Sequence, residues 1–460
     1  MSKLVSTNPS RNYEVIGEVE ISSKLEIREA AALAQVAKLQ WKETPLSERI
    51  TILRSVFDLF KDKKNIEKLA KLASQEMGMP IKESREDFMY GNRNLDWYLD
   101  HATAYLSPEV TYEDDNEIHA VYREPYGVTA VIVPWNFPFS NFVWQCGQNL
   151  IAGNVIVFKG SEEVPLFSKA LEEIMLSSLL PKGVFNVIYG DGKVGDQLVH
   201  ENIDLICFTG STNTGKYLYK VAAEKFIPVV MELGGSAPGV IFEDADISGV
   251  IETIVMNRFM NCGQICDGLK RLIVHKNVYS QVLKQLKEIF ENNIIGEAES
   301  DKTQMGPLVS QRQLDLLEEQ VGDALSKGAK VEIGGKIPKR LKGAYYEPTL
   351  LTNVKQNMRV WTEEVFGPVL PIVTFETEEE AVELANDTKY GLGSYVFTSD
   401  KERFQRVAMK LQAGMVSLNN TSYVMACNPF GGYKESGLGR EHGSYGFHDI
   451  TQVKVVSREK

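Results

Sequence analysis

The sequence predicts an α/β protein with two doubly wound parallel-sheet domains and a small β element. Three observations indicate this fold class. From about residue 120, short β-branched runs alternate with segments of helical character, and the alternation recurs in the second half of the chain. The length of 460 residues exceeds one ordinary domain of roughly 100–200 residues. Near-continuous apolar strands separated by helices are typical of parallel sheets covered on both faces.

The first segment, residues 25–77, predicts two or more amphipathic helices. Within it, the stretch ITILRSVFDLFKDKKNIEKLAKLA carries apolar side chains at helical spacing. The residues that share one face are Ile50, Leu53, Val56, Phe57 and Phe60. We expect this face to pack on a hydrophobic core.

The strands of the first predicted sheet are VTAVIVPW, NVIVFKG, VFNVIYG, LICFTGS and PVVMELGG, with helices at 139–152, 164–179 and 212–225. The second half repeats the pattern with RLIVH, VLPIVTF, SYVFTS and MVSLN, and with helices near 278–293, 310–327 and 377–386. The tail ITQVKVVS alternates like an exposed strand. We expect it to pair with EIHAVYREPYG or with a partner subunit.

Charge and composition exclude several classes of partner. The chain carries 50 basic and 62 acidic residues, a net charge of −12, whereas nucleic acids and anionic membranes select basic surfaces. No window approaches the ~20 apolar residues of a membrane helix, and no signal-peptide pattern is apparent. The five cysteines, an odd number in a chain that needs no disulfides, favour a reducing compartment, and we expect a cytoplasmic protein.

Two glycine-rich turns compete as phosphate-binding sites. Residues 190–195 form a G-x-G-x-x-G pattern, but the next strand starts within ten residues of Gly195. That distance leaves room for only two helical turns, which favours a tight turn over the usual dinucleotide fingerprint. The second turn, FTGSTNTG at 208–215, directly follows a strand and opens a helix, where free N–H groups bind anions. Ser211 would either bind a phosphate oxygen or simply cap the helix.

Cys266 is the candidate nucleophile. It ends the stretch NCGQIC, a small, polar, glycine-bearing segment that suits an exposed thiol. Cys262 would share a face with it if the stretch were helical. A metal site would need two more soft ligands at tight spacing, which the six histidines do not supply, so we expect no metal.

Two polar residues stand at strand ends. Glu232, in VVMELGG, would be costly to bury unless it is paired or functional, and burial would raise its pKa toward the range of a general base. Asn136, in PWNFP, places an amide donor at the carboxyl end of a strand, where it could stabilise an oxyanion or cap a turn.

Together these segments resemble the aldehyde dehydrogenase superfamily. The matching motifs are PWNFP at 134–138, AGN…VFKGSE at 152–162, FTGSTNTG at 208–215, MELGG at 231–235, NCGQIC at 261–266, EEVFGPV at 363–369 and PFGGYKESGLGRE at 429–441. They occur in the family's order and cover most of the chain from about residue 120.

The resemblance implies a three-part organisation. An NAD-binding domain would use residues 1–106 and 126–234, a catalytic domain residues 235–440, and an oligomerisation flap residues 107–125 and 441–460. A homo-oligomer, either a dimer or a tetramer, is expected on the same ground.

The resemblance also implies catalytic roles. The Cys266 thiolate would attack an aldehyde, while the Asn136 amide and the Cys266 N–H hold the oxyanion. After hydride loss, Glu232 would activate water to hydrolyse the thioester, and Glu441 would relay the proton. Many relatives carry Lys where this chain has Gln145, and Asp267 adds a negative charge beside the nucleophile.

The cofactor residues implied by the resemblance are Trp135, Lys159, Glu162, Gly210, Ser211, Gly234, Glu364 and Phe366. Among them, Lys159 and Glu162 would bind the adenosine ribose. Because the Glu162 carboxylate would repel a 2′-phosphate, we expect NAD to be preferred over NADP.

The implied substrate residues are Phe142, Trp144, Met260, Ile265, Tyr423 and Phe430. They are mostly apolar, which favours an apolar or aromatic aldehyde. Succinate-semialdehyde enzymes often place Arg near these positions, and Met260 stands where one such Arg would be. Asp267 among aromatic residues would instead suit a cationic aminoaldehyde. Two further alternatives are a CoA-acylating enzyme, which Glu232 disfavours, and a non-catalytic protein on the same scaffold.

Overall fold

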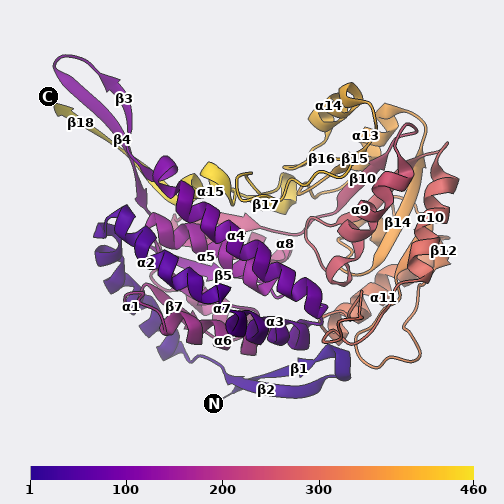
Figure 1. Ribbon diagram of the computed structural model, residues 1–460, viewed down its shortest axis with the longest axis horizontal. Helices are drawn as coiled ribbons and strands as arrows, with labels where there is room; N and C mark the ends of the chain where they lie inside the picture. Colours follow the sequence, from indigo (N-terminus) through magenta and orange to yellow (C-terminus); the bar gives the residue numbers. More distant parts are fainter. Residues whose placement is uncertain (1) are drawn as a thin grey trace.

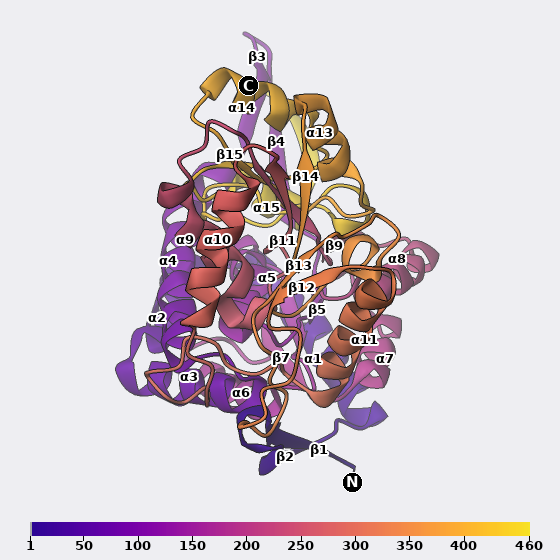
Figure 2. The same cartoon turned by 90° about the vertical axis from the view of Figure 1, so that its right-hand side faces the viewer.

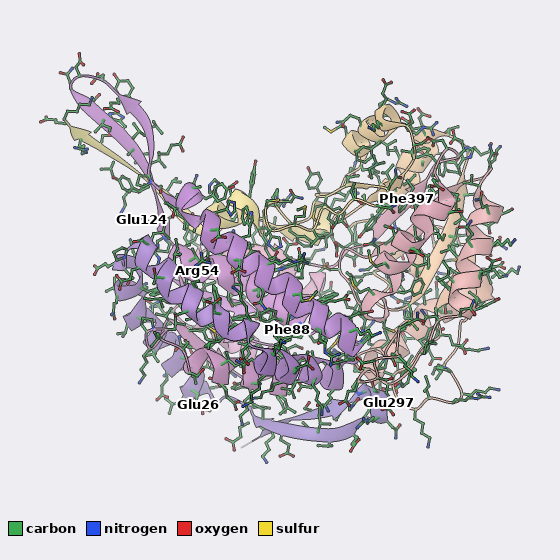
Figure 3. All side chains as sticks on the ribbon, in the orientation of Figure 1. Glu26, Arg54, Phe88, Glu124, Glu297 and Phe397 are labelled. Atoms are coloured by element: carbon green, nitrogen blue, oxygen red, sulfur yellow. The ribbon has the colours of Figure 1, made fainter. Side chains whose placement is uncertain are left out.

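The computed structural model describes residues 2–460. Its chain forms two α/β bodies, one drawn in indigo to magenta and the other in pink to orange (Figure 1). The view turned by 90° looks onto the second body, with the first body behind it (Figure 2). Figure 3 labels Phe88 in the first body and Phe397 in the second. Two parallel sheets and a small antiparallel sheet confirm the expected fold class.

The N-terminal segment contains more structure than the sequence patterns indicated. A hairpin of β1 (Lys3–Asn8) and β2 (Glu14–Glu20) comes first and was not anticipated. The helices that follow are α1 (Lys24–Glu43), α2 (Leu46–Asp58), α3 (Lys63–Met77) and α4 (Ile81–Leu106). Helix α4 lies beyond the segment predicted to be helical, and it packs along α5.

The first large sheet has six strands in the order β17-β9-β8-β5-β6-β7. Its parallel strands are β5 (Val128–Ile132), β6 (Val155–Lys159), β7 (Phe185–Ile188), β8 (Leu205–Thr209) and β9 (Val229–Glu232). The connecting helices are α5 (Pro138–Ala152), α6 (Pro165–Leu176), α7 (Gly192–His200) and α8 (Thr212–Lys225). Strand β17 (Gly437–Leu438) joins the edge antiparallel to β9.

The second large sheet has seven strands in the order β12-β13-β14-β11-β10-β15-β16. They are β10 (Ala237–Ile241), β11 (Leu269–His275), β12 (Lys330–Ile333), β13 (Thr349–Thr352), β14 (Val369–Phe375), β15 (Tyr395–Phe397) and β16 (Ser417–Leu418). The longer helices beside it are α9 (Ile247–Phe259), α10 (Tyr279–Glu291), α11 (Gln311–Ser326), α13 (Glu378–Asn386) and α14 (Lys401–Lys410). Every strand pairing in this sheet is parallel except that of β12 with β13.

The small sheet projects from the first body (Figure 1). Its order is β18-β4-β3, formed by β18 (Thr451–Glu459), β4 (Glu117–Pro125) and β3 (Glu109–Glu113). All nine residues of β18 pair antiparallel with β4, so the C-terminal strand finds its partner within its own chain. Helix α15 (Gly443–Asp449) leads into β18. No helix among residues 2–460 is long and apolar enough to cross a membrane.

Candidate active site

A cavity of about 740 Å³ lies where residues of the two large sheets and of α4 and α5 meet. Cys266, Glu232 and Asn136 all line it, although they come from three separate segments of the chain. Asn136 follows β5, Glu232 ends β9, and Cys266 lies between α9 and β11. The parallel topology explains this, because strands β5 and β9 of one sheet end at the same edge.

The turn before Cys266 is not a regular helix. After α9 ends, Asn261, Cys262 and Gly263 take positive φ angles of 50°, 56° and 74°. The two cysteines therefore do not share a helix face. Cys262 is buried, whereas Cys266 is partly exposed and lines the cavity.

Several contacts hold this unusual turn from both bodies. Glu83 of α4 accepts a hydrogen bond from the backbone N–H of Asn261 at 2.7 Å. The side-chain amide of Asn261 donates to the backbone oxygen of Asn136 at 2.6 Å, and the Asn136 amide donates to the backbone oxygen of Gln264 at 3.0 Å. Asn136 is thus tied to the loop that carries Cys266. Glu83 was missed because α4 itself was not anticipated.

The thiol of Cys266 lies among charged groups. Its Sγ is 3.9 Å from Oδ1 of Asp267. Burial raises the pKa of Cys266 well above its usual range, and the Asp267 carboxylate raises it further, while the Lys270 ammonium acts in the opposite direction. The charge conflict expected from Asp267 is therefore present in the structure.

Glu232 is the most isolated carboxylate of the site. It is 2% exposed, and within the described chain neither of its carboxylate oxygens has a hydrogen-bond partner. Burial raises the pKa of Glu232 well above its usual range, with Glu441 adding to the effect. A buried carboxyl of this kind is costly, which makes Glu232 a candidate functional group.

Glu441 lies beside Glu232, and burial raises the pKa of Glu441 to about 8. The Gln145 amide donates both to a Glu441 carboxylate oxygen and, at 2.8 Å, to the hydroxyl of Thr209. Gln145 therefore supplies neutral donors where many relatives would place a cation.

Most of the expected cofactor residues line the same cavity: Trp135, Gly210, Ser211, Gly234, Glu364 and Phe366. Ser211 is the N-cap of α8, with its hydroxyl accepting from the Thr214 N–H at 3.3 Å. The rings of Trp135 and Phe366 meet edge-on with centroids 5.7 Å apart. Lys159 and Glu162 form an ion pair at 3.3 Å at the end of β6 and are not among the lining residues.

The competing glycine pattern is a tight turn, as expected. Gly190 has a φ of 158°, Asp191 caps the short helix α7 through the Lys193 N–H, and the cavity does not reach these residues.

The expected substrate residues divide into two groups. Trp144, Met260, Ile265 and Phe430 line the cavity, and the rings of Trp144 and Phe430 have centroids 4.9 Å apart. Phe142 does not, and this expectation was wrong. It lies on the other face of α5, fully buried among Phe60, Phe139, Phe158 and Phe185.

Tyr423 also stands outside the cavity wall. Its hydroxyl donates to the backbone oxygen of Asp267 at 3.4 Å, and its ring lies 5.6 Å from that of Tyr395, which does line the cavity. Sequence reasoning missed Tyr90 and Arg93, which reach the cavity from α4, with the Arg93 guanidinium 5.8 Å from the centre of the Tyr90 ring.

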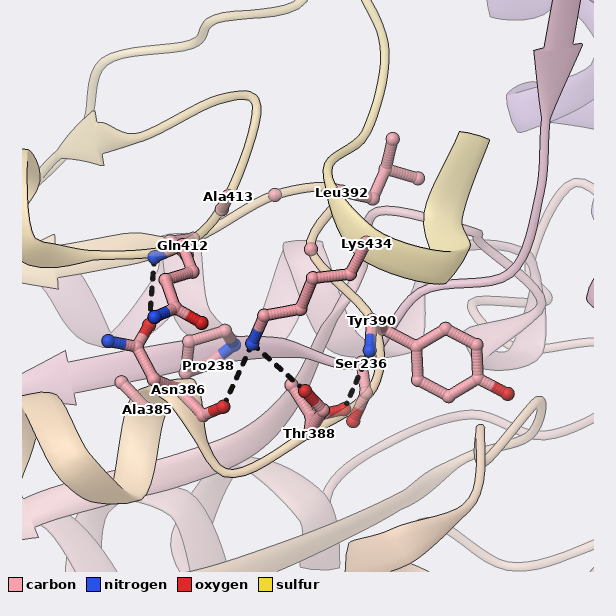
Figure 4. A pocket seen from close by; sticks show the side chains of 13 residues that line it. Ser236, Pro238, Ala385, Asn386, Thr388, Tyr390, Leu392, Gln412, Ala413 and Lys434 are labelled. Atoms are coloured by element: carbon pink, nitrogen blue, oxygen red, sulfur yellow. Dashed lines mark hydrogen bonds between the residues drawn. The ribbon is translucent and has the colours of Figure 1, made fainter. Parts of the chain in front are cut away.

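A second, much smaller cavity of about 10 Å³ lies behind the loop 386–394 (Figure 4). Lys434, in the motif PFGGYKESGLGRE, donates to the backbone oxygens of Asn386 and Thr388, both at 3.0 Å (Figure 4). The motif thus fixes the loop at the end of α13, in a space too small for a substrate. Among residues 2–460 no group of three or more His, Cys, Asp or Glu side chains could hold a metal ion.

The whole chain is similar to one family of known proteins. A family model described as "Aldehyde dehydrogenase family" matches residues 2–456. A glutarate-semialdehyde dehydrogenase of Pseudomonas aeruginosa is 36% identical over 98% of this chain and 93% of its own length. An aminoaldehyde dehydrogenase of Pisum sativum, described as peroxisomal, is 37% identical over 99% and 92%.

Solved structures agree with these matches. An E. coli NADP-dependent enzyme superposes with a TM-score of 0.95 at 34% identity, over 100% of this chain and 95% of the other. Betaine aldehyde dehydrogenase from Staphylococcus aureus, in complex with NAD+, superposes with a TM-score of 0.94 at 33% identity, over 98% and 91%.

Proposed function

The chain belongs to the aldehyde dehydrogenase family and is an NAD(P)-dependent oxidoreductase, and we propose that it oxidises an aldehyde to the carboxylic acid through an adduct on Cys266. The observation that carries the proposal is the convergence of Cys266, Glu232 and Asn136 on one cavity. We also propose the domain division, with residues 1–106 and 126–234 forming the cofactor-binding domain and residues 235–440 the catalytic domain.

The first half of the reaction forms a covalent adduct. The Cys266 thiolate forms a bond to the carbonyl carbon, and the carbonyl π pair moves onto oxygen. The Asn136 amide and the Cys266 N–H donate to that oxyanion. In the structure the Asn136 amide is held by the backbone oxygen of Gln264, so it is oriented before substrate arrives. A nicotinamide cofactor, when bound, would supply the hydride acceptor, and loss of hydride from the Cys266 adduct would leave a thioester on that sulfur.

The second half releases the acid. Glu232 takes a proton from water, the water oxygen attacks the thioester carbon, and the carbon–sulfur bond breaks to restore the thiolate. Glu441, with its raised pKa and its hydrogen bond to Gln145, receives the proton from Glu232 in our proposal. Because the Glu232 carboxylate has no hydrogen-bond partner in the part of the chain that the structure describes, it is free to turn toward the thioester.

The residues present fit a nicotinamide dinucleotide. The N-terminus of α8 and Ser211 would bind the pyrophosphate, and Glu364 with Phe366 would hold the nicotinamide ribose. A Cβ atom added to Gly234 would lie 2.4 Å from a Glu364 carboxylate oxygen, so only glycine leaves this part of the cavity open.

We propose that NAD is preferred over NADP. The support is the carboxylate of Glu162 next to Lys159 at the carboxyl end of β6, where it would accept both ribose hydroxyls and repel a 2′-phosphate. The test is kcat/KM with each cofactor for the protein and for Glu162→Gln. A tenfold preference corresponds to about 1.4 kcal/mol, and a preference for NADP in the unmodified protein would refute this assignment.

For the substrate we propose an apolar or aromatic aldehyde. The cavity walls near Cys266 supply Trp144, Met260, Ile265, Val424 and Phe430. A cationic aminoaldehyde is the second candidate, favoured by one observation: Asp267 lines the cavity 3.9 Å from the nucleophile. The deciding experiment is a panel of aliphatic, aromatic, semialdehyde and aminoaldehyde substrates. Asp267→Asn should leave aromatic turnover in place and depress aminoaldehyde turnover if the second candidate is correct.

We also propose that the small sheet carries self-association. It extends away from the body (Figure 1) and leaves Val110, Val453 and Val455 more than half exposed. Exposed apolar side chains on a projecting sheet suit contact with a second copy of the chain.

A further inference from the structure

Lys270 is a buried charged residue that the proposed reaction does not use. It lies at the start of β11, four residues after Cys266, and is 1% exposed. Its ammonium donates to the backbone oxygens of Gly235 at 2.9 Å and Cys266 at 3.0 Å, and it is paired with the Glu364 carboxylate. Burying an ammonium is costly unless it is well paired. These three acceptors offset the cost of burying the Lys270 charge.

The partners of Lys270 come from segments that build different parts of the cavity. Gly235 joins the two large sheets, Cys266 carries the thiol, and Glu364 precedes Phe366, whose ring centre lies 5.0 Å from the Lys270 ammonium. The approach is close, since a Cβ atom on Gly235 would lie 2.4 Å from the Cys266 backbone oxygen. Lys270 thus joins the nucleophile's segment to the segment of Glu364 and Phe366.

The same ammonium opposes several negative charges around the thiol. Asp267 is next in sequence, Glu232 faces the thiol from β9, and Glu364 faces it from the segment before β14. The hydroxyls of Tyr395 and Tyr423 donate to the backbone oxygen of Asp267. Each carboxylate disfavours a thiolate at Cys266, whereas a cation favours it.

We propose that Lys270 is a positioning and charge-balancing residue: it fixes the Cys266 backbone against the Glu364 segment and favours the thiolate against the Asp267 carboxylate. The inference deepens the proposed function, since it presumes that Cys266 acts as a thiolate. Lys270 acts on the sulfur through the Cys266 carbonyl and through its charge, and it does not touch the reacting atoms.

The charge balance is tested on the free protein, without cofactor or aldehyde. We would follow the rate of Cys266 alkylation by iodoacetamide against pH, read by peptide mass spectrometry. The background is Cys427→Ser, because Cys427 is exposed, whereas Cys146, Cys207 and Cys262 are buried. The variants are Lys270→Met, which keeps an apolar stem beside Phe366, Lys270→Arg, which keeps the charge, and Asp267→Asn.

Lys270→Met should move the alkylation midpoint upward by about one pH unit, a tenfold lower thiolate fraction at neutral pH. Asp267→Asn should move it downward, the double variant should return it near its original value, and Lys270→Arg should stay close to the parent. A purely structural role would not produce opposite shifts that cancel. Coincident midpoints for the parent, Lys270→Met and Asp267→Asn would overturn the inference.

If Lys270→Met does not fold, Lys270→Gln takes its place, because it keeps hydrogen-bond donors without the charge. An unshifted midpoint in folded Lys270→Gln, or in Asp267→Asn, counts against the proposal in the same way. Failure of the proposed function is seen separately, as aldehyde oxidation that survives Cys266→Ala.

Discussion

Cys266 and Cys262 are four residues apart, yet they differ in the properties that decide thiol chemistry. Cys266 lines the cavity beside Asn136 and Glu232. Cys262 is buried in the core of the second body, and burial raises its pKa above the ordinary range. Accessibility therefore distinguishes the proposed nucleophile, Cys266, from Cys262, although burial raises the pKa of both thiols.

The first prediction compares the two cysteines. Cys266→Ala should lower aldehyde oxidation by roughly 10⁴-fold or more, because the covalent step is lost, while cofactor binding stays nearly unchanged. Cys262→Ala should retain most activity and lose about 1 kcal/mol of stability from the small void it leaves. Steady-state rates and cofactor titration by fluorescence check both variants. Equal losses of activity in the two variants would contradict the assignment of Cys266 as the nucleophile.

The second prediction concerns Glu232. As a general base it must be ionised, and burial raises its pKa. The rate of thioester hydrolysis should therefore rise with pH through that raised pKa. Glu232→Gln should slow hydrolysis by about 10²–10⁴-fold and remove this pH dependence.

The burst of NADH on mixing separates the two steps for Glu232→Gln. The burst should persist while the steady-state rate falls, because the amide blocks only the hydrolytic half. Glu441→Gln serves as the comparison, since it removes the neighbouring carboxyl while the Glu232 carboxyl itself stays in place. A burst lost in proportion to the steady-state rate would refute the role of Glu232.

At the scale of elements, the turn between α9 and β11 decides whether the site exists. Three consecutive residues, 261–263, have positive φ angles, a conformation that costs non-glycine residues free energy. Such a turn persists only if its surroundings hold it. Glu83 of α4, Asn136 and the buried Arg258 supply those contacts, with Arg258 donating to the backbone oxygen of Gly263 at 3.5 Å.

The third prediction tests the Glu83 contact. Glu83→Gln keeps an acceptor for the Asn261 N–H, whereas Glu83→Leu leaves that buried donor unpaired, at a cost of about 1–3 kcal/mol. We expect the Leu variant to unfold at lower denaturant and to lose activity, and the Gln variant to do neither at neutral pH. Identical behaviour of the two variants would show that the contact is unimportant.

The Glu83 contact also gives a pH signature. Burial raises the pKa of Glu83 from its ordinary value of 4.5 to about 8 in the folded chain. Between these values the folded chain binds more protons than the unfolded chain, so raising the pH destabilises the folded state. Glu83→Gln should weaken this loss, which denaturant unfolding between pH 5 and about pH 8 measures.

At the scale of the whole molecule, the small sheet pairs segments that are far apart in the sequence. Strand β18 runs from the C-terminus back along β4, which lies more than 300 residues earlier. Within the flap, Val453 and Val455 lie on one face of β18 and Gln452 on the other, because successive side chains of a strand alternate.

The fourth prediction tests self-association through this sheet. Val453→Lys combined with Val455→Lys adds two charges to the exposed face without changing the ladder to β4. We expect a smaller particle by light scattering and a stability of the single chain within about 0.5 kcal/mol of the parent. Gln452→Lys, on the other face, is the matched control. An unchanged mass in the double variant would exclude this face as the interface.

Much of the fold was predictable because strands and helices leave local periodic patterns. Helix α8 matches its predicted range of 212–225, and all nine predicted strand segments of the two large sheets contain a strand. The elements that were missed include the hairpin β1–β2, the strands β10, β12 and β13, and the helices α4, α9 and α14. Helix α4 carries many polar residues, and its buried positions include Ser84, Asp87, Asn92 and Asn94. Its buried face therefore shows no continuous apolar pattern in the sequence.

The candidate site was predictable where a motif places a residue at a strand end, as with Asn136 and Glu232. It was less predictable on helices, because the sequence alone did not show which helix face lines the cavity. Phe142 was expected at the cavity because it is aromatic and close to Trp144, yet it faces a cluster of aromatic side chains on the opposite side of α5.

By itself, the sequence determined the alternation of strands and helices, the candidate nucleophile, and the resemblance that orders its motifs. These depend on residue type and on spacing within a short window. Only the tertiary structure decided that Lys270, Glu364 and Gly235 meet beside Cys266, that Glu83 holds the turn before Cys266, and that no residue among 2–460 forms a hydrogen bond with the Glu232 carboxylate. Such contacts join residues that are distant in sequence, and their energies depend on burial and charge, which arise only when the chain is packed.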